Sequence, residues 1–211
     1  MKKTLTFLSA LFVGAMLCSC GQPQETKENA NGMKENNAVI ENIMSRRSIR
    51  KYKEGAVPRD VMETILECGI NAPNGMNRQS WEVRVMDNPE VIGRLKEYMV
   101  QGNPQAKPEA VTGSFRGAPT LVFIANDPSY DLSPIDCGLL SENIILSAWS
   151  MGVGSVCLGI PMRFIKNSPE AVQMLQFSEG FTPVLCIGLG YPDETPDGKP
   201  RDKSKIKYIE K

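Results

Sequence analysis

The stretch TLVFIAN at residues 120–126 constrains the fold more than any other part of this chain. Five apolar residues follow Thr120 without a polar residue between them. A strand with one solvated face alternates apolar and polar residues, whereas a strand buried on both faces is a nearly continuous apolar run. We therefore expect this segment to be a strand in the interior of a sheet.

Three further short segments have the composition of strands. WEVRVMD at 81–87 alternates bulky and polar residues. GSVCLGI at 154–160 and PVLCIGLGY at 183–191 are short and mostly apolar, with glycines among the apolar residues. The chain thus supplies about four strands.

Segments with a helical spacing of apolar residues lie between these strands. The expected helices cover AVIENIMS (38–45), PRDVMETILECGINA (58–72), PEVIGRLKEYMV (89–100), SPIDCGLLSENIILSAWSMG (133–152), RFIKN (163–167) and PEAVQMLQF (169–177). In the longest of them Leu140, Ile144 and Ala148 recur every fourth residue, and Gly152 suits its end. Helices that alternate with strands predict a layered domain of mixed α and β structure.

Residues 101–119, QGNPQAKPEAVTGSFRGAP, have the composition of a loop because glycine, proline and polar residues dominate. A structureless connection of this length is uncommon inside a compact domain, and long loops often form lids or bind ligands. We therefore expect a lid or binding loop here, with Lys107, Glu109 and Arg116 among its charged residues.

The first nineteen residues have the three-part pattern of an export signal. Two lysines precede an apolar run from Leu5 to Leu17, and small residues follow. The apolar run is too short to span a membrane. We expect residues 1–19 to be a signal peptide that is removed from the folded protein.

The sequence LCSC at 17–20 resembles a bacterial lipobox, which implies that Cys20 becomes a lipidated N-terminus. Ordinary signal-peptidase cleavage nearby is the alternative. Residues 20–37 contain almost no apolar side chains and are expected to form a flexible tether, so that the folded domain covers 38–211. This interpretation implies an exported protein that is lipid-anchored to the bacterial cell envelope, at the outer membrane.

Charge and residue usage exclude several classes of function. The chain has 24 basic and 24 acidic side chains, and this balance gives no electrostatic footprint for nucleic acid or for an acidic lipid surface. The sequence contains no histidine, which excludes Ser-His and Cys-His nucleophile pairs and every histidine-containing metal site. We expect no nucleic-acid partner.

Four cysteines lie in the part expected to fold, each among apolar neighbours and none in a CxxC spacing. They are Cys68, Cys137, Cys157 and Cys186. Isolated cysteines in apolar runs are more often small core residues than disulfides or metal ligands. We expect free, buried thiols and no metal site.

The segment SRRSIRKY at 45–52 gathers three arginines and two serines in one short stretch. If it leaves the preceding helix as an extended strand, alternate side chains point the same way, so Arg46, Ser48 and Arg50 face one ligand. Guanidinium groups that converge in this way suit a phosphate. A solvated basic turn is the alternative interpretation.

Two other polar segments complete the set of candidates. NAPNGMNRQSW at 71–81 offers amides that can donate to and accept from the edge of a heteroaromatic ring, although asparagine and glycine are also common in ordinary turns. LGYPDETPDGKPR at 189–201 adds positive charge after the last expected strand, and alone it would be a surface tail.

The order of these segments resembles the nitroreductase family of flavin mononucleotide (FMN) oxidoreductases. The motifs that carry the resemblance are the arginine-serine cluster, APNxxNxQxW, GAP before a strand, MGVGSVCLG, GYP and KPR. They span residues 38–211. The resemblance implies an α+β fold of three α/β/α layers with a central mixed, mostly antiparallel sheet, in a homodimer with FMN at the interface.

Site residues follow from the resemblance motif by motif. Arg46, Ser48 and Arg50 would hold the phosphate and ribityl chain of FMN, and Arg47 would contribute through its backbone. The late basic pair would close on the same phosphate. This pair is Lys199 and Arg201.

The amide segment and the expected strand at 154–160 would contact the rest of the flavin. Pro73 and Asn74 would line it from one subunit, while Asn77 and Gln79 would hydrogen-bond the ribityl chain or the ring edge. Ser80 departs from the proline usual in the family. The backbone next to the reactive ring nitrogen would come from Leu158 and Gly159.

The implied activity is transfer of a hydride from NAD(P)H to a nitroaromatic or quinone-like acceptor by a ping-pong mechanism, with the chemistry carried by FMN rather than by a side chain. Two alternatives stay open at this point. One is another flavin reaction on the same fold, such as dehalogenation or flavin fragmentation. The other is a non-catalytic flavin-binding lipoprotein, because NAD(P)H is scarce outside the cytoplasm.

Overall fold

One antiparallel sheet organises the chain, whose computed structural model describes residues 37–210. The strands lie in the order β1-β2-β4-β3, and each neighbouring pair is antiparallel. Their bounds are Trp81–Met86 (β1), Thr120–Asn126 (β2), Gly154–Leu158 (β3) and Thr182–Gly190 (β4). All four strands expected from the sequence are present, and β2 is an interior strand, as its composition predicts.

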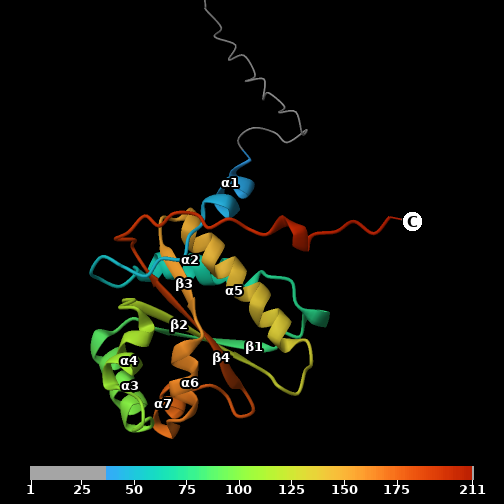
Figure 1. Ribbon diagram of the computed structural model, residues 1–211. Helices are drawn as coiled ribbons and strands as arrows, with labels where there is room; N and C mark the ends of the chain where they lie inside the picture. The colour runs from blue at the N-terminus through green and yellow to red at the C-terminus, as the bar shows by residue number, and fades with distance from the viewer. Residues whose placement is uncertain (1–36, 211) are drawn as a thin grey trace, which may run out of the picture. The chain divides into compact units, whose positions relative to one another are not determined.

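Helices cover both faces of the sheet (Figure 1). Their bounds are Ala38–Ser45 (α1), Arg59–Ile70 (α2), Pro89–Gln101 (α3), Pro108–Thr112 (α4), Ser133–Ser150 (α5), Ile160–Lys166 (α6) and Pro169–Met174 (α7). Short 3₁₀ turns occupy Gly75–Asn77, Gly113–Phe115 and Lys203–Lys205. The fold is therefore α+β in three layers, which confirms the expected class.

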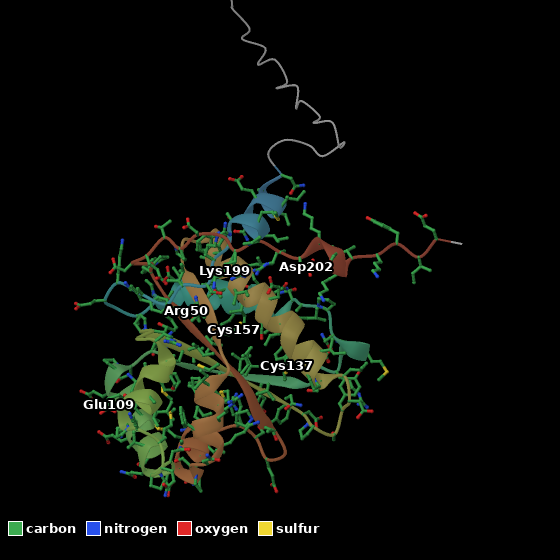
Figure 2. All side chains as sticks on the ribbon, in the orientation of Figure 1. Arg50, Glu109, Cys137, Cys157, Lys199 and Asp202 are labelled. Atoms are coloured by element: carbon green, nitrogen blue, oxygen red, sulfur yellow. The ribbon has the colours of Figure 1, made fainter. Side chains whose placement is uncertain are left out.

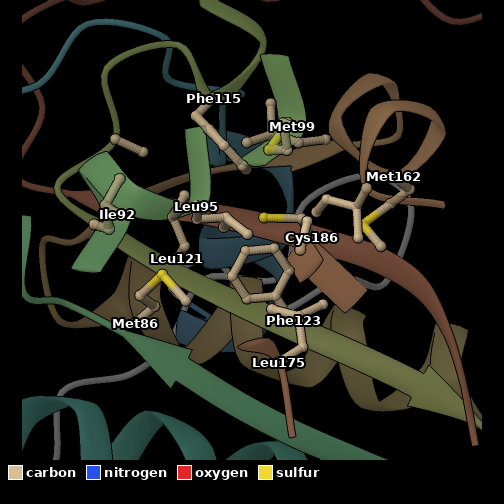
Figure 3. Packing of buried hydrophobic residues seen from close by; sticks show 14 of the residues in the cluster. Met86, Ile92, Leu95, Met99, Phe115, Leu121, Phe123, Met162, Leu175 and Cys186 are labelled. Carbon is tan, nitrogen blue, oxygen red and sulfur yellow. The ribbon is translucent and has the colours of Figure 1, made fainter. Parts of the chain in front are cut away.

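Alternate residues of β2 point into two separate cores. Leu121 and Phe123 join one cluster with side chains of α3, α4, α6 and α7 (Figure 3). Val122 and Ile124 join the other cluster with side chains of α2 and α5. Because successive side chains of a strand point to opposite faces, a strand that feeds two cores needs apolar residues at every position.

A mixed, mostly antiparallel sheet was expected, and the four strands pair in antiparallel fashion. The parallel component is an isolated bridge between Ser48 and Ser155, beside which the Ile49 amide donates to the Ser155 carbonyl at 2.9 Å. An antiparallel bridge joins Tyr52 to Pro192. The segment after α1 thus extends the sheet beyond β3 without forming a regular strand.

The expectation of a lid or loop at 101–119 is wrong. This segment contains α4 and the 3₁₀ turn Gly113–Phe115, and the side chains of Val111 and Phe115 are buried in the first core. Phe115 packs edge-on against Phe123, with ring centroids 6.3 Å apart. These two buried apolar side chains hold the segment on the sheet, although glycine, proline and polar residues dominate its sequence.

The expectation of four buried thiols is half right. All four cysteines are free, but only Cys137 and Cys186 are buried. Burial raises the pKa of the Cys137 thiol to about 11 and also raises the pKa of the Cys186 thiol. The buried face of α2 includes Gly69, which packs against Ile144. Cys68 lies beside this face and is therefore exposed. Cys157 is exposed because its side chain lies on the opposite face of β3 from the core residues Val156 and Leu158.

The helix expected at 38–45 is present as α1, and its apolar residues are exposed. Two polar contacts attach α1 to the C-terminal part of α5. The Asn42 side chain donates to the Leu146 carbonyl at 2.9 Å, and the Trp149 indole donates to the Ser45 hydroxyl at 2.9 Å.

The expected signal peptide, the lipidated Cys20 and all but the last residue of the tether lie outside the described residues. Within residues 37–210 no helix combines the length and the apolar character needed to cross a membrane.

Replacing Phe123 with alanine should lower the free energy of unfolding by about 3–5 kcal/mol, since it removes a fully buried ring from the contact of β2 with the first core. Urea denaturation of the cofactor-free protein measures this change. Phe177→Ala deletes the same atoms from a partly exposed ring that packs at the edge of the same core, and it should cost less than half as much. Equal losses in the two variants would contradict the assignment of Phe123 to the core.

Candidate functional site

The segment SRRSIRKY follows α1 and lies along β3. The Ile49 side chain points inward and is 1% exposed, so its neighbours Ser48 and Arg50 face away from the core. Gly154 makes room for this packing, because a Cβ at that position would lie 2.7 Å from Ile49 Cγ1. The burial of Ile49 therefore turns Ser48 and Arg50 to the outward side of the segment, as the alternation predicted for these two residues.

The guanidinium groups of this segment have different surroundings. Arg47 donates to the carbonyls of Met44 and Arg46, at 2.8 and 2.9 Å, and is held by the backbone. Arg46 is half-buried, and its guanidinium has no hydrogen-bond or ion-pair partner among residues 37–210. Arg50 is exposed, and within residues 37–210 its guanidinium donates only to the Ser48 carbonyl, at 3.2 Å. Arg46 and Arg50 can therefore accept an anionic ligand.

The hydroxyl of Tyr52 holds this segment against β4 through hydrogen bonds. It donates to the Ile49 carbonyl at 2.6 Å and approaches the Gly188 carbonyl of β4 at 3.4 Å. Burial raises the pKa of the phenol, and the Glu194 carboxylate raises it further. The hydroxyl therefore keeps its proton, and its hydrogen bond, throughout the neutral range.

The segment after β4 pairs with the same stretch from the other side. The Asp193 amide donates to the Lys51 carbonyl at 3.0 Å, and the Glu194 carboxylate accepts from the amides of Arg50 and Lys51. Farther along, a Cβ at Gly198 would lie 2.6 Å from Arg47 Nη2.

This packing places Lys199, the first residue of the late basic pair, near the arginine cluster. Lys199 follows Gly198 directly, and Figure 2 shows Lys199 and Arg50 in the same region of the molecule. Lys199 and Arg201 are both exposed. The structure thus joins the first and third polar segments, which are about 150 residues apart in the sequence.

The amide segment at 71–81 forms a strained turn. Met76, Asn77 and Gln79 have left-handed backbone angles, with φ of 53°, 53° and 49°. Asn74 braces the turn, because its side-chain oxygen accepts from the Gln79 amide at 2.9 Å. The side chains of Asn77 and Gln79 are exposed, and no hydrogen bond from either to another described residue is found. The side-chain amides of Asn77 and Gln79 are therefore free to contact a ligand, whereas the Asn74 side chain is already hydrogen-bonded within the turn.

This turn and the arginine cluster lie at opposite ends of α5. The turn contacts the start of the helix at Ser133 and Asp136, whereas α1 and the arginines are attached near Leu146 and Trp149. At a rise of 1.5 Å per residue the two groups are roughly 15–24 Å apart along the helix axis. Within one chain the structure does not bring the asparagines to the arginines.

Leu158 and Gly159 lie where β3 meets α6. The Leu158 side chain is buried in the first core, which leaves its backbone as the part that can contact a ligand. Gly159 is exposed, precedes α6 directly and has no atom within 4 Å of the position that a Cβ would take. A planar group can therefore approach this backbone closely.

Sequence reasoning missed three residues that shape the site. Asp136 accepts hydrogen bonds from the amide turn, Tyr130 packs its hydroxyl against Gly75, and Glu194 holds the arginine segment. A single carboxylate in the first turn of a largely apolar helix was the available signal for Asp136. Nothing local distinguishes Tyr130 or Glu194 from surface residues.

The donor set fits a phosphorylated heteroaromatic cofactor better than a metal. A half-buried guanidinium without an acceptor, a second arginine and a nearby lysine form one cluster, and unpaired side-chain amides form the other. Among residues 37–210 there is no group of three acidic or cysteine side chains that could hold a metal ion.

Comparisons with known proteins agree with this donor set. The model of the nitroreductase family matches residues 43–191. A putative NADH dehydrogenase/NAD(P)H nitroreductase of Methanothermobacter thermautotrophicus is 30% identical over 163 residues, which cover 75% of this chain and 79% of that protein. 

Two solved structures have the same fold. A nitroreductase with bound FMN from Desulfitobacterium hafniense superposes with a TM-score of 0.74 at 28% identity, covering 83% of this chain and 100% of that one. A nitroreductase with bound FMN from Bacteroides fragilis gives a TM-score of 0.75 at 26% identity with the same coverage.

Replacing Gly154 with alanine should destabilise the protein by about 1–3 kcal/mol, because the new methyl group would overlap Ile49 and Pro192. Gly93→Ala is the matched control, since a Cβ there meets nothing within 4 Å inside α3. It should stabilise by about 0.5–1 kcal/mol. Thermal denaturation of both variants measures the difference, and shifts of the same sign would contradict the packing of Ile49 over β3.

Proposed function

The chain belongs to the nitroreductase family, and on this premise we propose that it is an FMN-dependent oxidoreductase. It takes a hydride from NAD(P)H and delivers it to nitroaromatic or quinone-like acceptors. The donor follows from the names of the relatives, and the acceptor class from the resemblance of the motifs.

The observation that carries this proposal is that Arg46 is half-buried while its guanidinium has no acceptor among the described residues. A guanidinium that is partly withdrawn from water without a partner is stabilised by an anionic ligand. Ser48 and Arg50 follow it in the same segment and face outward, and Lys199 is near. A phosphate monoester at the end of a ribityl chain satisfies this set.

FMN, when bound, supplies the redox chemistry, accepting the hydride and passing electrons to the second substrate. The role of the protein is to bind FMN and to orient it. Asn77 and Gln79 would present donors and acceptors to the ribityl chain or the ring edge, and the backbone at Leu158 and Gly159 would contact the ring. No side chain has to act as nucleophile or general acid, which agrees with a sequence that lacks histidine.

One site serving both substrates in turn implies ping-pong kinetics. The purified protein should be yellow, and anaerobic NADH or NADPH should bleach the flavin absorbance before any acceptor is added. Subsequent addition of a quinone or nitroaromatic should restore the colour. A flavin that both nicotinamides leave oxidised would contradict the proposed donor.

The distance along α5 between the arginine cluster and the amide turn supports a site shared between two copies of the chain. Each chain carries the arginine cluster at one end of α5 and the asparagine turn at the other, so a homodimer can bring one chain's arginines to its partner's amides. Apolar side chains that suit such an interface are exposed on α1, on α5 and in the C-terminal segment. They are Ile43, Met44, Ile135, Leu139, Ile206 and Tyr208.

Replacing Arg46 or Arg50 with alanine should weaken FMN binding about 10- to 100-fold, because a charge-assisted hydrogen bond contributes about 1.5–3 kcal/mol. Quenching of FMN fluorescence on titration with apoprotein measures the dissociation constant. Arg94→Ala removes an exposed arginine from α3 and should leave the affinity unchanged. Full flavin affinity in both test variants would overturn the assignment of the phosphate site.

A mixture of Arg46→Ala and Asn74→Ala chains tests the shared site. Each variant alone should be inactive at limiting FMN, since both of its sites are damaged. After the two are unfolded and refolded together, about a quarter of the sites should be intact, because half of the dimers are mixed and each has one undamaged site. Absence of any recovered activity, or a flavin-loaded monomer in light scattering, would contradict the shared site.

We also propose, from the sequence alone, that Cys20 is lipidated and anchors the exported protein to the cell envelope. The wild-type protein expressed in a bacterium with lipoprotein machinery should fractionate with membranes, whereas Cys20→Ala should become soluble. Cys18→Ala is the control, since that residue would be lost with the signal peptide. A wild-type protein found wholly in the soluble periplasmic fraction would overturn the anchor.

A further inference from the structure

We propose that Asp136 is a positioning residue of the flavin site, because it holds the amide turn in the conformation that presents Asn77 and Gln79. The proposal rests on the proposed function, in that the amides serve FMN. It adds a residue that touches neither cofactor nor substrate.

The Asp136 carboxylate clamps the turn at both ends. One oxygen accepts from the Gly75 amide at 3.0 Å, and the other accepts from the Ser80 hydroxyl at 2.9 Å. Asp136 is 3% exposed, and Ser80 is buried as well. The four residues between these two contacts, 76–79, include all three left-handed residues of the turn and both exposed amides.

Two further hydrogen bonds hold the Ser80 end of the turn, one from α5 and one from the residue after β2. The Ser133 hydroxyl donates to the Ser80 carbonyl at 2.6 Å, and the Asp127 amide donates to the same carbonyl at 3.0 Å. The Gly75 end has less support, since the Tyr130 hydroxyl only packs against it. Asp136 is therefore the group that ties the Gly75 end to α5.

Two features indicate that the carboxylate has a specific role. Residues other than glycine in the left-handed region are costly to maintain, and three of them in four positions persist only where surrounding contacts hold them. A buried carboxylate is also costly unless its oxygens are hydrogen-bonded. Here each cost is offset by the same two hydrogen bonds, and the position of Asp136 in the first turn of α5 further favours its negative charge.

The substitution Asp136→Ala removes both contacts. In the apoprotein it should speed hydrogen exchange at the Gly75 amide, and it should weaken FMN binding about 10-fold or more. Asp136→Asn retains an acceptor for Gly75 and can donate to the Ser80 oxygen, so it should keep the affinity within about three-fold of wild type. Ser80→Ala loses one contact and should fall between these variants.

Ser141→Ala is the matched control for a loss of stability alone. It removes a buried hydroxyl of α5, which donates to the Cys137 carbonyl at 2.6 Å, and it leaves the turn untouched. It should lower the unfolding temperature without changing Gly75 exchange or FMN affinity. Hydrogen exchange, fluorescence titration with FMN and thermal denaturation are measured on all four variants and on the wild type.

The outcomes separate this inference from the proposed function. A wild-type protein that binds no FMN overturns both. Wild-type FMN binding with unchanged exchange and affinity in Asp136→Ala overturns the positioning role alone. If Asp136→Ala does not fold, unchanged affinity in Ser80→Ala, or a loss in Asp136→Asn as large as 10-fold, has the same meaning.

Discussion

The packing of α5 against the sheet is the interaction on which the rest of the structure depends. Leu140, Ile144 and Ala148 are completely buried against one face of the sheet, so the helix is rigidly attached along its length. Both halves of the candidate site are hydrogen-bonded to this helix, one at its first turn and one near its last. Their separation is therefore set by a core contact rather than by the loops that carry the polar residues.

The arginine half of the site is built by an apolar residue. Ile49 enters the space left by Gly154, and this burial turns the neighbouring polar side chains outward. The segment after β4 then closes over the same stretch through backbone hydrogen bonds and Glu194. A chain with no net charge thus acquires a local cluster of cations, because the fold gathers basic residues from both ends of the domain.

The amide half of the site is held in a strained form by its neighbours. The turn at 75–80 departs from the backbone conformations that its residues prefer, and hydrogen bonds from α5 and from the end of β2 compensate for the strain. Strain of this kind concentrates at functional sites, where a particular side-chain direction matters more than local stability. The same turn leaves the side chains of its two exposed amides without hydrogen-bond partners within residues 37–210.

The sequence by itself determined the strands, most of the helices and the family. Apolar periodicity identified β2 as an interior strand and α5 as the principal helix, because these patterns follow directly from the geometry of the backbone. It failed at 101–119, where two buried anchors, Val111 and Phe115, are outnumbered by polar residues, and at Cys68 and Cys157, whose apolar neighbours do not reveal which way the thiol points. The motifs named Arg46, Ser48 and Arg50 as a group, and the packing of Ile49 gives the physical reason why Ser48 and Arg50 both face outward. Only the tertiary structure decided that Lys199 lies near this group, that Asn77 and Gln79 lie at the far end of α5, and that Asp136 and Glu194 hold the two halves in place. These contacts join residues 61 to about 150 positions apart, and their distances depend on the packing of whole layers, which no local pattern encodes.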